Sequence, residues 1–97
     1  MGRSVKIERS KRPGKKFTAI FDVNGRKKTV NFGSAGMDDF TKTGDSAQRS
    51  RYRSRHAKDL RTGDPTRAGF LSYYLLWGPS KSMQANLRSY KRKFNFN

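Results

Sequence analysis

The sequence predicts a small α+β domain, in which a short antiparallel sheet comes first and two or three helices follow. Between residues 17 and 32, two runs of β-type residues flank an Asn-Gly pair, and beyond residue 45 apolar residues recur at helical intervals. The chain has 97 residues, of which 12% are aromatic. That length allows one domain with a thin core, which a few large aromatic side chains are able to fill.

A β-hairpin is predicted over about residues 17–32. Apolar and polar residues alternate in its first strand. One face of that strand carries Phe17, Ala19, Phe21 and Val23. Asn24-Gly25 follows, and both residues tolerate the positive φ angles of a type I′ turn. Because a hairpin alone is marginal in water, it must pack on other elements.

Residues 1–16 are predicted to form a basic N-terminal arm in front of a single small α+β domain over residues 17–97. Its cations far outnumber its only acid, Glu8. Val5 and Ile7 alternate with polar residues, which allows a short edge strand over residues 4–9.

A loop over residues 33–45 and a helix over about 46–61 come next. Asp45 is a suitable N-cap for this helix, which is polar on almost every face. Such a helix needs either docking through Tyr52 or a bound anion to be stable.

Two further helices are predicted over about residues 67–77 and 81–94. The first is apolar nearly all round, so it should be the central element of the core, and Gly78-Pro79 ends it. Ser80 is a suitable cap for the second. The second helix has one apolar stripe, formed by Met83, Leu87, Tyr90 and Phe94.

The net charge is the strongest functional signal. The chain carries 23 Lys and Arg against 7 Asp and Glu, a formal net charge of +16, and its sequence pI is about 11.1. Solubility requires roughly 2 to 8 net charges in a small domain. The excess indicates a polyanionic partner, and nucleic acid is favoured over anionic lipid headgroups and acidic proteins.

We expect the phosphate contacts to come from the arm, the hairpin tip and the surfaces of two helices. No recognition helix and no RNA-reading aromatic box is present, so little base readout is expected, and the residues alone do not separate DNA from RNA. The predicted nucleic-acid-binding residues are Arg3, Lys6, Arg9, Lys11, Arg12, Lys15, Lys16, Arg26, Lys27, Lys28, Arg49, Arg51, Arg53, Arg55, Arg88, Lys91, Arg92 and Lys93.

Enzymatic and metal chemistry is not expected. Asp38 and Asp39 match no calcium loop and are better explained by caps, turns and internal pairing with arginine. His56 is expected to pack or hydrogen-bond beside Tyr52, because no residue pairs with it as a catalytic partner. The sequence therefore nominates no catalytic residue, no metal ligand and no cofactor, although a role beyond structure for Asp38, Asp39 and His56 stays open.

The expected setting is intracellular or inside a virion. The chain has no cysteine, no apolar signal segment and no apolar run long enough to span a bilayer. The thin core and the apolar helix favour a homodimer somewhat over a monomer.

Three ordered blocks carry a resemblance to a known family. They are VNFGSAGMDDFT at residues 30–41, Arg49-x-x-Tyr52-x-x-Arg55-His56, and AGFLSYYLLWGPS at residues 68–80. Over about residues 28–94 the chain resembles small basic virion-associated proteins of unknown function from large nucleocytoplasmic DNA viruses, such as marseilleviruses, iridoviruses and chlorella viruses. The resemblance implies a protein packaged with the genome in the virion interior, and present in the host cytoplasm or nucleus during infection, and it favours DNA over RNA as the partner.

The leading hypothesis is therefore a non-enzymatic virion protein that binds nucleic acid and condenses or packages DNA through its phosphates. The alternative is a structural adaptor that links capsid and genome or binds acidic host proteins. A small nuclease is a third, weaker class, because the chain lacks a firm cluster of His, Asp and Glu.

Overall fold

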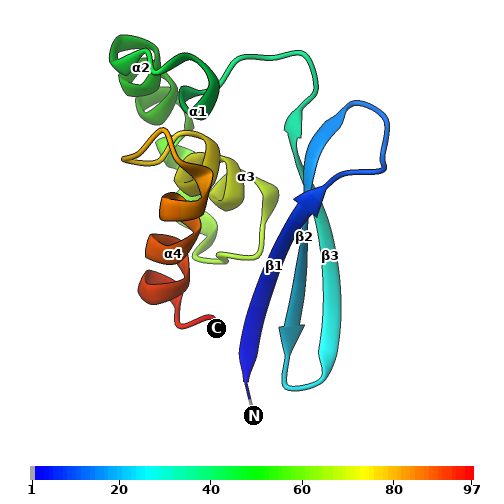
Figure 1. Cartoon of the computed structure of the whole chain (residues 1–97). Helices are drawn as coiled ribbons and strands as arrows, with labels where there is room; N and C mark the ends of the chain where they lie inside the picture. The colour runs from blue at the N-terminus through cyan, green and yellow to red at the C-terminus, as the bar shows by residue number, and fades with distance from the viewer. Residues whose placement is uncertain (1) are drawn as a thin grey trace.

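The computed structural model describes residues 2–97 and confirms the α+β class: a three-stranded antiparallel sheet is followed by helices that pack on one of its faces (Figure 1). The elements in chain order are β1 (Arg3–Arg9), β2 (Lys15–Val23), β3 (Arg26–Ser34), α1 (Phe40–Thr43), α2 (Ser46–His56), the 3₁₀ turn η1 (Ala57–Thr62), α3 (Ala68–Leu71), the π-turn η2 (Ser72–Leu76) and α4 (Met83–Phe94).

The predicted hairpin is formed by β2 and β3. The turn between them places Asn24 at φ 54° and Gly25 at φ 86°, the positive angles that Asn-Gly was expected to supply. The strand register pairs Phe17 with Phe32. Every second side chain of β2 from Phe17 onward faces the helices. Ala19 and Phe21 are fully buried on this inner face, so the hairpin gains its stability from the helical layer.

The basic N-terminal segment supplies the edge strand of the sheet. β1 pairs antiparallel with β2 along its whole length, from Arg3 opposite Val23 to Arg9 opposite Phe17. The C-terminus lies beside β1 (Figure 1), where the Asn97 N–H donates to the Arg3 carbonyl at 2.6 Å. The chain end thus covers part of a strand edge that would otherwise expose unpaired backbone groups.

The centre of the helical layer is the segment formed by α3 and η2. Leu71 and Leu75 have no solvent exposure and pack in one cluster with the inner face of the sheet. The sequence predicts one continuous helix over 67–77, but the second half is a π-turn, in which the Trp77 N–H donates to the Ser72 carbonyl at 3.0 Å. This pairing releases the Tyr73 carbonyl, which an α-helix would have used.

Three boundary predictions need correction. The α-helix expected over 46–61 ends at His56 and continues as the 3₁₀ turn η1. The expected loop over 33–45 contains the short helix α1, because the Asp39 side chain accepts from the Lys42 N–H and so caps a turn. The cap of α4 is Ser82, whose hydroxyl accepts from the Ala85 N–H at 3.2 Å, and Ser80 instead accepts from Ser82.

A buried amide joins α4 to the π-turn. Asn86 is 1% exposed, and its side-chain nitrogen donates to the carbonyls of Leu75 and Ser80 at 2.9 and 2.8 Å. Its oxygen accepts from the Ser80 N–H at 3.0 Å. The buried residues of α4 are Asn86 and Tyr90. The apolar stripe predicts Tyr90 but not Asn86, because an amide whose hydrogen bonds are all satisfied can be buried without belonging to an apolar pattern.

Candidate nucleic-acid interface

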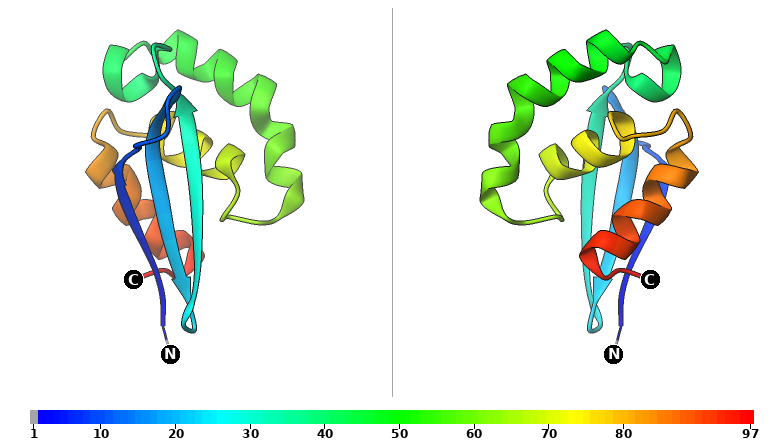
Figure 2. Two further views of the ribbon diagram at one scale, coloured as in Figure 1. Left: turned by 90° about the vertical axis from the view of Figure 1, so that its right-hand side faces the viewer. Right: turned by 90° about the vertical axis from the view of Figure 1, so that its left-hand side faces the viewer.

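Helix α2 docks on the core through an aromatic stack around Tyr52, which is one of the two alternatives that the sequence leaves open. The Tyr52 ring lies between His56 and Trp77, with centroid distances of 4.1 and 4.3 Å. Burial raises the pKa of the Tyr52 hydroxyl, and the nearby Asp59 raises it further. The stack fixes α2, which arcs over the other helices together with η1 (Figure 2), at a set distance from the sheet.

Two of the α2 arginines predicted to contact phosphate point into the fold. Arg53 Nη1 donates to the carbonyls of Tyr73 at 3.4 Å and Trp77 at 2.7 Å, and its guanidinium lies 4.0 Å from the Tyr73 ring centroid. Arg49 Nε donates to the Gly78 carbonyl at 2.7 Å. Burial lowers the pKa of Arg49, and the charge of Arg53 lowers it further. These guanidinium groups satisfy the carbonyls at the end of the π-turn.

Other predicted contact residues also have internal partners. The Arg3 guanidinium lies 4.4 Å from the Phe96 ring centroid. Lys16 Nζ lies 2.5 Å from the Asp39 carboxylate, which is buried. These two cations are therefore held against the protein.

The remaining predicted cations are mostly exposed and fall into separate groups. The exposed members are Lys6, Arg9, Lys11, Arg12, Lys15, Arg26, Lys27, Lys28, Arg51, Arg55, Arg88, Arg92 and Lys93, whereas Lys91 is half-buried. The hairpin tip lies at the opposite end of the sheet from the β1–β2 loop (Figure 1), so the structure does not bring these two groups together. The start of β2 and α2 line one cleft.

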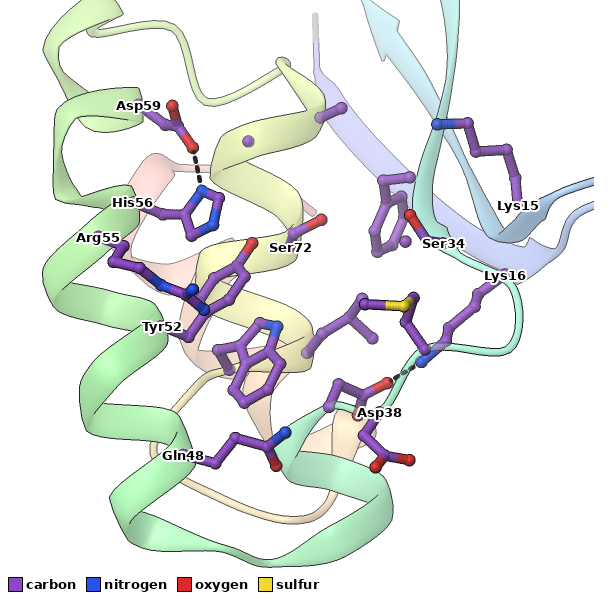
Figure 3. Close-up of a pocket in the computed structure, with 18 of the residues that line it drawn as sticks. Lys15, Lys16, Ser34, Asp38, Gln48, Tyr52, Arg55, His56, Asp59 and Ser72 are labelled. Atoms are coloured by element: carbon purple, nitrogen blue, oxygen red, sulfur yellow. Dashed lines mark hydrogen bonds and ion pairs between the residues drawn. The ribbon is translucent and has the colours of Figure 1, made fainter.

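A cleft of about 630 Å³ separates these two elements. One side is formed by the start of β2 and the end of β3, the other by α2, and the α3–η2 segment closes the floor (Figure 3). Lys15 and Arg55, which are both exposed, lie on opposite sides of this cleft. We call it the α2–sheet cleft.

The α2–sheet cleft also contains groups that the sequence does not single out. Gln48, Ser34 and Ser72 contribute polar side chains, and Met37, which is 62% exposed, lies at its margin. These residues come from three segments that are far apart in the sequence, and no linear pattern connects them. The exposed Lys58 and Arg61 on η1 extend the basic surface beyond α2 and were also missing from the predicted set.

His56 is packed and hydrogen-bonded, as predicted. Its Nδ1 lies 3.0 Å from the Asp59 carboxylate, and its ring stacks on Tyr52. Both side chains are about one-third exposed, at 39% for His56 and 33% for Asp59. The pair therefore belongs to the wall of the cleft and orients the imidazole within it.

Two of the three aspartates of the 33–45 segment act as caps, and the exposed Asp38 pairs with Lys42. Asp39 caps α1 and accepts from the Thr41 hydroxyl, while Asp45 caps α2 by accepting from the Gln48 N–H at 3.0 Å. Internal pairing was expected with arginine, but the partner of Asp39 is Lys16. Within residues 2–97, no group of three or more His, Asp and Glu side chains is placed to hold a metal ion.

Comparison with known proteins places these features in a family. A family of unknown function, DUF5754, matches residues 5–56, which is more than half of the chain. The chain belongs to the DUF5754 family. The match runs from β1 to the end of α2, so the strands and the helix on the two sides of the α2–sheet cleft lie within the matched segment, whereas the α3–η2 floor lies beyond it.

No curated protein and no solved structure matches this DUF5754 member. Across residues 2–97, none of its helices has the length and apolar character needed to cross a membrane.

Proposed function

We propose that this DUF5754 protein binds nucleic acid, with DNA favoured, by placing phosphates against the cations on both sides of the α2–sheet cleft. One observation carries the proposal: Lys15 and Arg55, which are 40 positions apart in the sequence, flank the same cleft. The exposed cations of the β1–β2 loop adjoin Lys15, and Arg51 adjoins Arg55 on α2. A polyanion that lies across the cleft contacts both groups at once.

The cations of this surface are available for a partner. Within residues 2–97, none of the ion pairs involves Lys11, Arg12, Lys15, Arg51 or Arg55. The carboxylates in those ion pairs use other cations, as Asp39 does with Lys16 and Asp64 does with Arg67. Unpaired cations on a protein with a net charge of +16 repel one another, and neutralisation by phosphates removes that repulsion.

The mechanism is counterion release with little base readout. About five phosphate contacts give a slope near −4.5 in a plot of log affinity against log salt, so affinity should fall about 500-fold between 50 and 200 mM salt. Arginine pairs with two phosphate oxygens at once, whereas lysine acts as a point charge, so both residue types suit the role. The viral resemblance supports a packaged genome as the partner, with the protein acting in its condensation and without enzymatic activity.

Fluorescence anisotropy with random-sequence duplex DNA across a salt series tests the proposal. The double variant Lys15→Gln/Arg55→Gln should lose at least about tenfold in affinity at low salt, and its salt slope should fall by about 2. The matched control Arg26→Gln/Lys27→Gln removes the same charge from the hairpin tip and should lose much less. Equal losses in the two variants would show that the charge is not localised at the cleft, and no binding of duplex DNA at 50 mM salt would refute phosphate-directed duplex binding.

A further inference from the structure

The α2–sheet cleft is lined by groups that a phosphate alone would not contact. Its floor and margin include the apolar side chains of Leu76 and Met37 and the buried indole of Trp77. Gln48 adds an amide, which both donates and accepts hydrogen bonds, and Ser72 adds a hydroxyl. An inorganic phosphate or the backbone of a duplex would leave all these groups unused.

We propose that the α2–sheet cleft takes an unpaired nucleotide, with its base against the apolar and amide groups and its phosphate between Lys15 and Arg55. This inference rests on the proposed function, because it names the form of nucleic acid that the same cleft admits. A base has a flat apolar face and a rim of donors and acceptors, which matches an apolar floor beside Gln48 and Ser72. In a duplex the face of the base is stacked and its donors and acceptors are paired, so only an unpaired base can offer them to the cleft.

The acids of the cleft separate this ligand from other anions. Asp38 and Asp59 line the same space as Lys15 and Arg55. A carboxylate of an acidic peptide entering the cleft would be repelled by them, whereas the amino groups of adenine, cytosine or guanine can donate to them. The phosphate then lies by the two exposed cations, Lys15 and Arg55.

The size of the cleft agrees with a small organic ligand. Its volume of about 630 Å³ falls within the range of roughly 300–1,000 Å³ that is typical of small-molecule sites. The protein also carries its own reporter, because Trp77 is the single tryptophan of the chain and lies in the lining. A base that enters should therefore change the Trp77 fluorescence, and binding far from the cleft should not.

The experiment titrates the full chain with a 5′-phosphorylated deoxyadenosine dinucleotide at 50 mM salt and follows Trp77 fluorescence. Tripolyphosphate, which has phosphates and no base, is the control ligand. We expect saturable quenching by the dinucleotide and at least about tenfold weaker binding of tripolyphosphate. An equal response to the two ligands would overturn the inference, because it would identify a phosphate site that ignores the base.

Two variants keep the result specific to the cleft. Ser34→Phe places a ring in the cleft from the exposed last residue of β3 without changing the charge, and it should weaken the dinucleotide at least about tenfold. Gln48→Ala removes the amide and should weaken it about threefold to tenfold. Unchanged dinucleotide affinity in a folded Ser34→Phe variant overturns the inference, and if that variant does not fold, Gln48→Ala and the tripolyphosphate comparison decide.

Duplex DNA binding is measured on the same samples and separates the two proposals. If duplex DNA binds and the dinucleotide does not, only the inference about an unpaired nucleotide fails. If the dinucleotide binds and duplex DNA does not, the broader proposal of phosphate-directed duplex binding fails and the nucleotide site stands.

Discussion

Replacing Arg53 with methionine should destabilise the protein while leaving its affinity for duplex DNA nearly unchanged. Arg53 donates a 2.7 Å hydrogen bond to the Trp77 carbonyl, and its guanidinium stacks over the Tyr73 ring. A hydrogen bond from a charged group contributes about 1.5–3 kcal/mol, and a cation–π contact contributes about 0.5–2 kcal/mol. We therefore expect a loss of about 2–4 kcal/mol in the free energy of unfolding, because the variant leaves a carbonyl of the π-turn unpaired.

The matched control is Arg51→Met, which removes the same charge from an exposed position two residues earlier on α2. Urea unfolding should show a change within about 0.5 kcal/mol for the control. Thermal melts followed by circular dichroism should show a decrease in the melting temperature of about 8–32 °C for Arg53→Met, since 1 kcal/mol shifts a domain of this size by about 4–8 °C.

Duplex DNA anisotropy on the same two proteins should give the opposite order, with roughly fivefold weaker binding for Arg51→Met and less than about twofold for Arg53→Met. Equal melting temperatures for the two variants, or a greater loss of DNA affinity in Arg53→Met than in Arg51→Met, would refute an internal role for Arg53. The second result would return Arg53 to the phosphate contacts that the sequence predicts.

Three further predictions follow from buried groups and from the separation of the charged ends. Asp39→Asn should cost about 3 kcal/mol in urea unfolding because it breaks a buried ion pair and weakens a helix cap, whereas Asp38→Asn on the exposed neighbour should cost less than about 0.5 kcal/mol. Burial raises the pKa of Tyr90, so its stabilisation is fully present below about pH 10 and is lost as pH rises from the unfolded pKa towards the folded one. Tyr90→Phe should therefore flatten the decline in unfolding free energy between pH 9 and pH 11, and an unchanged decline contradicts this. The double variant Arg26→Gln/Lys27→Gln should bind a single duplex with an affinity within about threefold of wild type and yet lose most DNA condensation in light scattering. Condensation at the wild-type level would refute the idea that the cleft and the hairpin tip each hold a separate duplex.

The regular elements were predictable because their signals are local. Asn24-Gly25 determines the hairpin turn through its own φ preferences, and Asp45 caps α2 from the position that the sequence indicates. The π-turn was not predictable, because a backbone carbonyl in it takes its hydrogen bond from a side chain that is distant in the sequence. The Tyr73 carbonyl is left without its helical partner and is contacted by Arg53, a residue 20 positions away.

The site could be predicted only in part, for a related reason. Net charge shows how many cations the chain carries, but a guanidinium that faces a backbone carbonyl has the same sequence signature as one that faces solvent. Arg53 and Arg51 illustrate this, since they are two positions apart and lie on different sides of α2. The cleft depends on tertiary packing, because Ser34, Gln48 and Ser72 are brought together only after α2 docks on Trp77.

The positions of the exposed cations favour bridging over simple coating of DNA. Lys15 begins β2 and Arg26 begins β3, at opposite ends of a nine-residue strand that spans about 30 Å. The Debye length is about 10 Å at 0.1 M salt, so each end is screened from the other and a phosphate bound at one end does not neutralise the other. In a molecule 40 Å long, the hairpin tip therefore stays charged after the cleft is occupied. For the proposed DNA binding, the tip is then available to attract a second duplex, and two such contacts on one small protein are what the proposed condensation requires.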